Sequence, residues 1–174
     1  MTTRSHAHTH TMTRIDIDTG IEFGEFVAAF EAAAPRVDLE AVRRLIAEGG
    51  NWDDVRTATA ANAPNGLMIY ATIDATELFV VAGHSGKAME YLLGNHVIAE
   101  TMYRHDAKAM LYAPLRVLIH SNGGGEAVFT MDRPGDSFAS LGNGEVSAVG
   151  EDLNRKVAAL LGVIGVDAAD AFGG

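Results

Sequence analysis

The sequence predicts an α+β fold in two layers, an antiparallel sheet with helices on one face. β-prone runs follow one another along the middle of the chain and are joined by short turns, a spacing that favours antiparallel pairing. Segments with helical periodicity gather at the ends and in the middle of the chain, which favours their packing on a single face of the sheet. No internal repeat or interdomain linker interrupts the 174 residues, so we expect one domain.

The two ends of the chain are expected to lie outside this domain, which we place at residues 14–166. Residues 1–13 predict a disordered tail, and residues 167–174 predict a flexible one. The first tail carries three alternating histidines, His6, His8 and His10. In an extended chain their imidazoles would lie on one side and could share a divalent metal, although a solvated tail that binds metal adventitiously is the simpler interpretation.

The N-terminal third predicts a strand followed by three helices. Residues 14–18 alternate in polarity, as a strand does. Residues 19–22 (TGIE) fit a capping box, so we expect a helix to begin at Thr19 and to end at Pro35. Its apolar stripe is Phe23, Phe26, Val27 and Phe30. Asp38 and Asn51 are expected to cap the second and third helices.

The middle of the chain predicts a hairpin. Residues 67–73 (LMIYATI) and 78–82 (LFVVA) are β-prone and are separated by four turn-forming residues. Residues 88–93 (AMEYLL) favour a strand, with a helix as the alternative. Residues 96–105 predict a helix capped by Asn95.

The C-terminal part predicts a second hairpin and a last helix. Residues 115–120 (LRVLIH) and 127–131 (AVFTM) flank a glycine turn at residues 121–125. A glycine-rich segment through Gly144 then leads to a helix. The apolar stripe of that helix is Leu153, Val157, Leu160, Leu161 and Ile164.

Composition excludes several classes of protein. Lys and Arg number 13 against 23 Asp and Glu, a net charge of −10, which disfavours nucleic acid as a partner. The sequence contains no run of 18 apolar residues, so it predicts no membrane span. The absence of cysteine excludes disulfides, thiolate metal sites and cysteine nucleophiles. The N-terminus has no apolar secretory core, so we expect a cytoplasmic protein.

Three motifs together resemble a known family. They are residues 91–96 (YLLGNH), residues 113–117 (APLRV) and the hairpin around residues 123–125. Their order and spacing are similar to those of the bacterial and archaeal family called domain of unknown function 302, over roughly residues 66–161. The resemblance implies an α+β fold like that of the TATA-binding-protein-like superfamily and a homodimer, and it implies no established activity. The family's usual proline after Gly-Asn is replaced here by His96.

The densest polar cluster surrounds the predicted helix at residues 96–105. His96 and Glu100 are four residues apart and share one helix face, where they could supply two metal ligands or a base with its orienting partner. His105 would complete a metal site only if the helix ended early, because nine residues of regular helix place it on the opposite face. Asn95 is the expected cap, and an anion could lie over the amides that follow it.

The strand at residues 115–120 carries the other candidates for ligand binding. Alternation places Arg116 and His120 on one face, which would be the open side of the sheet if Val117 faces the helices. Arg116 is expected to be an edge charge, to pair with a carboxylate such as Asp74 or Glu100, or to bind an anionic ligand in a bidentate manner.

These residues predict a small-ligand-binding or interaction domain, homodimeric and without demonstrated catalysis. The candidate ligand-binding residues are Asn95, His96, Glu100, Arg116 and His120. The alternative is a metal- or haem-dependent enzyme or binding protein that uses His96 and Glu100, with His105 as a third metal ligand. Histidine and methionine are available for haem, but no Cys-x-x-Cys-His motif permits covalent attachment. No cofactor is favoured, and whether the protein is an enzyme stays open.

Overall fold

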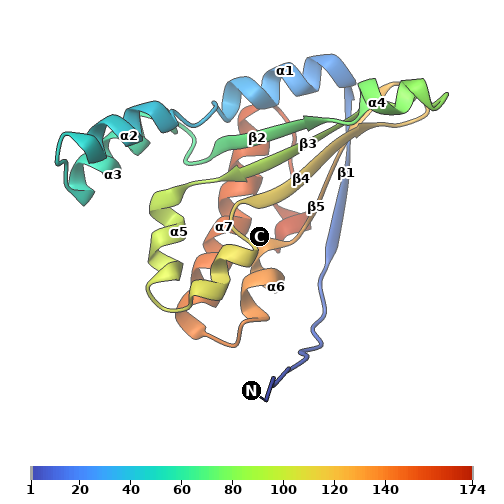
Figure 1. Cartoon of the computed structure of the whole chain (residues 1–174). Helices are drawn as coiled ribbons and strands as arrows, with labels where there is room; N and C mark the ends of the chain where they lie inside the picture. Colours follow the sequence, from blue (N-terminus) through green and yellow to red (C-terminus); the bar gives the residue numbers. More distant parts are fainter. Residues whose placement is uncertain (1, 174) are drawn as a thin grey trace.

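The computed structural model describes residues 2–173 and contains a five-stranded sheet in the order β1-β5-β4-β3-β2 (Figure 1). Every neighbouring pair of these strands is antiparallel. The strands are β1 (Arg14–Glu22), β2 (Met68–Asp74), β3 (Ala88–Gly94), β4 (Leu115–Ser121) and β5 (Glu126–Asp132). The predicted α+β class, with an antiparallel sheet and helices packed on it, is confirmed.

Helices follow every strand except β4, which is joined directly to β5. They are α1 (Phe23–Ala33), α2 (Leu39–Ala47), α3 (Trp52–Asn62), α4 (Thr76–Val81), α5 (His96–Tyr103), α6 (Pro134–Ala139) and α7 (Gly144–Val163), with the 3-10 turns η1 (Ala107–Leu111) and η2 (Asp170–Phe172). Asp38 caps α2 and Asn51 caps α3, as predicted. The carboxylate of Asp38 and the amide oxygen of Asn51 each accept backbone N–H from the first turn of the helix that follows. Among residues 2–173, no helix has both the length and the apolarity that crossing a bilayer requires.

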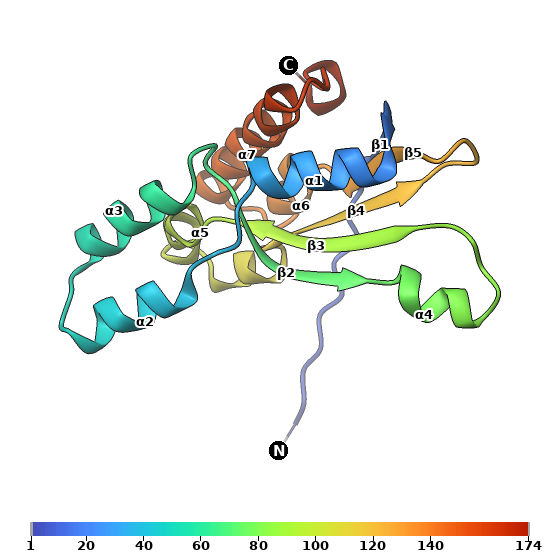
Figure 2. The same cartoon turned by 90° about the horizontal axis from the view of Figure 1, so that it is seen from above.

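Alternation along β4 divides the sheet into two faces. Val117 and Ile119 are fully buried on the face that we call the covered face. Arg116, Leu118 and His120 point to the other side, the open face. Seen from above in Figure 2, α1 and α7 lie along the same side of the strands.

The core lies between the covered face and these two helices. Its largest fully buried aromatic side chains are Phe26, Phe30, Tyr91, Phe129 and Phe138. The ring of Phe30 lies 5.2 Å from that of Tyr91 and 6.1 Å from that of Phe129, so α1 contacts the centre of the sheet through aromatic pairs.

Two glycines bring α6 against α7. A Cβ on Gly150 would lie 2.8 Å from the Cβ of Phe138, so only glycine permits this approach. Across the same contact, the backbone N–H of Gly135 donates to the side chain of the buried Asn154 at 2.9 Å.

The expected helix start at Thr19 is wrong. β1 continues to Glu22, and α1 begins at Phe23 with the carboxylate of Glu22 accepting the N–H of Glu25 at 3.0 Å. The hydroxyl of Thr19 donates instead to the carbonyl of Ala127 at 2.7 Å. Pairing with β5 therefore outweighs the local capping signal.

The first predicted hairpin is wrong in its second strand. Residues 78–82 belong largely to the helix α4, and the strand that pairs with β2 is β3. The side chain of Asp74 accepts the N–H of Thr76 at 2.8 Å, which turns the chain at the end of β2. The strand at residues 88–93 and the hairpin of β4 and β5 are confirmed, whereas α6 was not anticipated in the glycine-rich segment.

The two chain ends differ from each other. Residues 2–13 contain no helix or strand, although Thr13 is hydrogen-bonded to Arg133, between β5 and α6, and to Asp136 of α6. At the other end, the flexible tail predicted at residues 167–174 stays a prediction, and its last residue lies outside the residues that the structure describes. Ala168 and Phe172 are buried in the core beside α7, because η2 turns the chain back onto it.

Candidate ligand-binding groove

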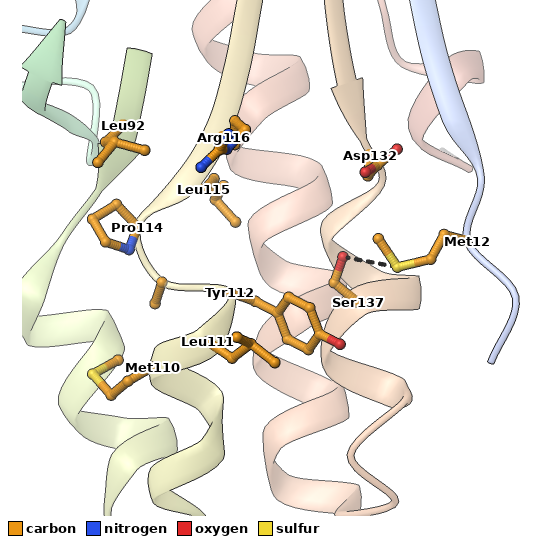
Figure 3. A pocket seen from close by; sticks show the side chains of 11 residues that line it. Met12, Leu92, Met110, Leu111, Tyr112, Pro114, Leu115, Arg116, Asp132 and Ser137 are labelled. Atoms are coloured by element: carbon orange, nitrogen blue, oxygen red, sulfur yellow. Dashed lines mark hydrogen bonds between the residues drawn. The ribbon is translucent and has the colours of Figure 1, made fainter. Parts of the chain in front are cut away.

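A groove with a volume of about 360 Å³ opens at one end of the open face (Figure 3). Its walls come from the adjoining ends of β3 and β4, from the η1 segment, from α6 and from the N-terminal segment. The side chains that line it are those of Met12, Leu92, Met110, Leu111, Tyr112, Ala113, Pro114, Leu115, Arg116, Asp132 and Ser137. Most of these residues are apolar, but polar atoms supply nearly half of the groove surface.

Arg116 supplies the cationic group of the groove. Its Nη1 lies 3.2 Å from Oε1 of Glu90 on the neighbouring strand, and its side chain is 75% exposed. The expected partners Asp74 and Glu100 are wrong, because the register of β3 and β4 pairs Glu90 with Leu118, which makes Glu90 a diagonal neighbour of Arg116 on the same face. A guanidinium has several N–H donors, so one contact with Glu90 leaves donors for a ligand.

A second ion pair lies across the groove mouth. Nε of Arg14 on β1 lies 2.5 Å from Oδ1 of Asp132 on β5. A shallower hollow of about 200 Å³ extends from these two residues over Leu118 and Thr130, and Arg116 lines both hollows. The open face therefore carries paired charges of both signs near its groove end.

The N-terminal segment forms one wall of the groove. The N–H of Thr13 donates to Asp136 at 2.8 Å, and the N–H of Arg133 donates to the carbonyl of Thr13 at 2.8 Å. The adjacent Met12 contributes its thioether, which accepts from the hydroxyl of Ser137 at 3.6 Å (Figure 3). Burial alone would raise the pKa of Asp136, but hydrogen bonds from Arg133 and Thr13 hold that pKa below its usual value.

His120 shares the open face with Arg116, as alternation predicts, but it does not line the groove. Its Nε2 lies 3.5 Å from the hydroxyl of Thr130, and that hydroxyl donates to Asp16 at 2.6 Å. His120 is thus tied into a polar row in the middle of the open face, away from the groove end of β4.

His96 lies in a separate cluster that joins α5 to α3 and β2. Its Nε2 lies 2.6 Å from the hydroxyl of Thr59, and its Nδ1 lies 2.8 Å from the hydroxyl of Tyr70. The Thr59 hydroxyl donates to the carbonyl of Val55, so it accepts from Nε2 of His96. A neutral imidazole with its proton on Nε2, which accepts from Tyr70 at Nδ1, fits these contacts and agrees with the pKa of His96, which burial lowers.

Burial shapes the acid–base behaviour of this cluster. It lowers the pKa of His96 and raises the pKa of Tyr70 to about 12. Both side chains therefore stay uncharged at neutral pH. They border an apolar cavity of about 180 Å³, which shares Met110, Ala113, Pro114 and Leu115 with the groove.

The structure does not assemble the predicted pair of His96 and Glu100. Glu100 pairs with Arg104 one turn further along α5, while both ring nitrogens of His96 are already hydrogen-bonded. Within residues 2–173, no three His, Asp or Glu side chains come close enough to hold a metal ion, so the structure does not bring His96, Glu100 and His105 together as the predicted metal site. Coordination of haem or metal by His96 would require the contact with Tyr70 or Thr59 to break.

Asn95 acts as the cap of α5, as predicted. Its Oδ1 accepts the N–H groups of Val97 and Ile98, and its Nδ2 donates to the carbonyl of Gly66. The side chain therefore already satisfies the amides over which an anion could have bound. Of the five predicted ligand-binding residues, only Arg116 lines the groove, while Asn95 and His96 border the apolar cavity.

An antiparallel sheet covered by helices on one face, with a groove at one end of the other, defines the class of small α+β domains. Within that class the chain belongs to the family described as Domain of unknown function DUF302, whose model matches residues 51–164. The resemblance in the sequence motifs is thereby confirmed.

The fold is also similar to a solved structure, described as an uncharacterized conserved protein DUF302 from Bacillus stearothermophilus. The two share 13% sequence identity and a TM-score of 0.61, over 86% of this chain and 96% of that one. A search of curated proteins gave no match.

Proposed function

We propose that this protein is a binding domain that holds a small amphipathic anion in the groove beside Arg116. The observation that carries the proposal is an exposed guanidinium at the mouth of a hollow with apolar walls. Ligand sites typically combine an apolar lining with a few polar groups that orient the ligand. The hydroxyls of Tyr112 and Ser137 add hydrogen-bonding groups on the opposite wall.

An anionic head group fits Arg116 better than a cationic one. A guanidinium binds carboxylates and phosphates in a bidentate geometry, and such charge-assisted bonds are stronger than neutral ones. Glu90 already neutralises part of this charge, so the ligand needs an apolar body to add binding energy. Leu92, Leu111 and Pro114 offer the surface for that body.

Titration with the fluorescent anion 8-anilino-1-naphthalenesulfonate tests the proposal. We expect Arg116→Gln to weaken binding about tenfold, since a hydrogen bond to a charged group contributes roughly 1.5–3 kcal/mol. The matched control is Arg56→Gln, which removes another exposed, carboxylate-paired arginine on α3. Equal affinity in the two variants would refute the role of Arg116.

We further propose that the protein is a homodimer that pairs through the open face. Leu118 lies in the centre of this face and is only partly buried, between Arg116 and His120. Light scattering after size exclusion should show a dimer that Leu118→Glu dissociates and Val163→Glu, on the exposed end of α7, leaves intact. A monomeric wild-type protein would contradict this proposal.

A further inference from the structure

Charged side chains of alternating sign cross the groove end of the open face. They come from four neighbouring strands, in the order Glu90 (β3), Arg116 (β4), Asp132 (β5) and Arg14 (β1). Arg14 lies opposite Asp132 in the register of β1 and β5. The row contains two carboxylates and two guanidinium groups, so a ligand that reaches it meets both signs of charge.

Arg116 and Asp132 are neighbours in this row that do not pair with each other. The register of β4 and β5, continued by one position beyond its last pair, sets Arg116 opposite Asp132. Residues opposite each other in antiparallel strands carry their side chains on the same face of the sheet. The partner of Arg116 is instead Glu90. The partner of Asp132 is Arg14, so the two opposite charges in the middle of the row face a ligand separately.

Both of these residues keep hydrogen-bonding capacity for a ligand. The contact of Asp132 with Arg14 uses Oδ1, and Oδ2 has no partner among residues 2–173. The side chain of Asp132 is 38% exposed. The guanidinium of Arg116 contacts Glu90 through Nη1, which leaves other N–H groups for a carboxylate. A ligand can therefore bind Arg116 and Asp132 while both ion pairs persist.

Asp132 is the acidic residue of the groove. It lines the groove together with Arg116, whereas Glu90 lines only the shallower hollow beside it. Figure 3 shows both side chains at the same end of the groove, with Leu111 and Tyr112 toward its other end. A carboxylate bound to Arg116 and an ammonium bound to Oδ2 of Asp132 thus lie next to each other, and an apolar group attached to them extends along the groove.

Electrostatics favour a ligand without net charge at this site. A net anion approaches the acidic surface of a chain with a formal charge of −10. It also brings a second negative charge next to Asp132. A zwitterion presents its carboxylate to Arg116 and its ammonium to Asp132, so each charge meets one of opposite sign.

We propose that the ligand of the groove is a free α-amino acid with a large apolar side chain. Its ammonium and carboxylate are attached to one carbon, so they are neighbours as Asp132 and Arg116 are on the sheet, whereas a peptide carries these charges at opposite ends. Its side chain lies against Leu92, Leu111 and Pro114, in a hollow whose volume of about 360 Å³ is in the usual range for small ligands. This inference rests on the proposed anion site at Arg116 and names its class of ligand.

Three aromatic compounds that differ in their charged groups test the proposal. They are L-phenylalanine, 3-phenylpropionate, which lacks the ammonium, and 2-phenylethylamine, which lacks the carboxylate. Each is titrated against protein loaded with 8-anilino-1-naphthalenesulfonate, so that displacement of this probe reports binding in the groove. We expect phenylalanine to displace the probe at about one-tenth of the concentration that 3-phenylpropionate requires, because it adds one charge-assisted hydrogen bond. The amine should be the weakest of the three.

The variant Asp132→Asn separates the ammonium contact from the rest of the site. It should abolish the tenfold advantage of phenylalanine. The naphthalenesulfonate probe should bind this variant about twofold more tightly than the wild type, because a negative charge beside Arg116 has been removed. Binding of the probe also shows that the variant is folded. The matched control is Asp152→Asn on α7, which removes another exposed carboxylate paired with an arginine and should keep the advantage.

The results distinguish this inference from the anion site on which it rests. If phenylalanine displaces the probe no better than 3-phenylpropionate does, or if its advantage survives Asp132→Asn, the amino acid is overturned and Arg116 remains an anion site. If Arg116→Gln leaves the affinity for the probe unchanged, both proposals are overturned.

Discussion

The two faces of the sheet differ in how their side chains are held. On the covered face, Val117, Ile119 and Phe129 are completely buried under helices. On the open face, Arg116 and Glu90 form a cross-strand ion pair in which the arginine side chain is 75% exposed and the glutamate side chain 24% exposed. Burial of apolar side chains stabilises the fold strongly, whereas exposed ion pairs contribute little. The open face can therefore carry binding groups without a large effect on stability.

The sharpest test of this comparison is Phe129→Ala on the covered face. The side chain is 0% exposed and packs against Phe30, so its removal leaves a cavity in the core. We expect a loss of about 3–5 kcal/mol in the free energy of unfolding, measured by urea denaturation. A loss below about 1 kcal/mol would show that the core repacks and that side chains on the two faces stabilise the fold to a similar extent.

A smaller effect is expected from Tyr70→Phe in the His96 cluster. The substitution keeps the ring and removes the hydroxyl that donates to Nδ1 of His96. A half-buried acceptor then loses its partner, and the free energy of unfolding should fall by about 1–2 kcal/mol. Tyr103→Phe, on the exposed side of α5, is the matched control and should be neutral. Equal stability of both variants would show that the Tyr70–His96 bond contributes nothing.

The same cluster predicts a dependence of stability on pH. The folded state lowers the pKa of His96 from 6.5, so the unfolded chain takes up this proton more readily than the native protein. The contribution of His96 is complete above pH 6.5 and is lost as the pH falls through its lowered native pKa. We expect the melting temperature of the wild type to fall more between pH 7.5 and 5.5 than that of His96→Gln. Parallel curves would contradict the neutral imidazole.

The smallest effect on stability is expected from Glu90→Gln on the open face. The ion pair with Arg116 is exposed on the arginine side, so its loss should change the free energy of unfolding by less than about 0.5 kcal/mol. The affinity for an anionic probe should instead rise, because Arg116 is no longer neutralised. Unchanged probe affinity together with a large loss of stability would reverse the assignment of the two faces.

Local sequence signals predicted those elements whose stabilising contacts are close in sequence. The hairpin of β4 and β5 is joined by a glycine turn, and Asp38, Asn51 and Asn95 cap helices that follow them directly. α4 was mistaken for a strand because an apolar run suggests burial, whereas these side chains are exposed. The period of such a short run does not separate the two structures.

The sequence predicted the placement of the site residues only where alternation along a single strand was enough to assign them to one face. Arg116 and His120 do share the open face. The partners of His96, by contrast, are 26 and 37 residues away in Tyr70 and Thr59, and no periodicity connects positions so far apart. Glu90 became the partner of Arg116 through the register of two strands, which is a property of the sheet and not of either segment alone.

The pairing of the first strand with the last determines the order in which the chain can fold. Arg14 pairs with Asp132, 118 residues later, so β1 has no strand to join until β5 has been made. During synthesis from the N-terminus, the first strand must wait while most of the chain emerges, and closure of this long loop is entropically costly. The β3–β4–β5 meander can form earlier from near neighbours, and β1 then completes the sheet as its final edge.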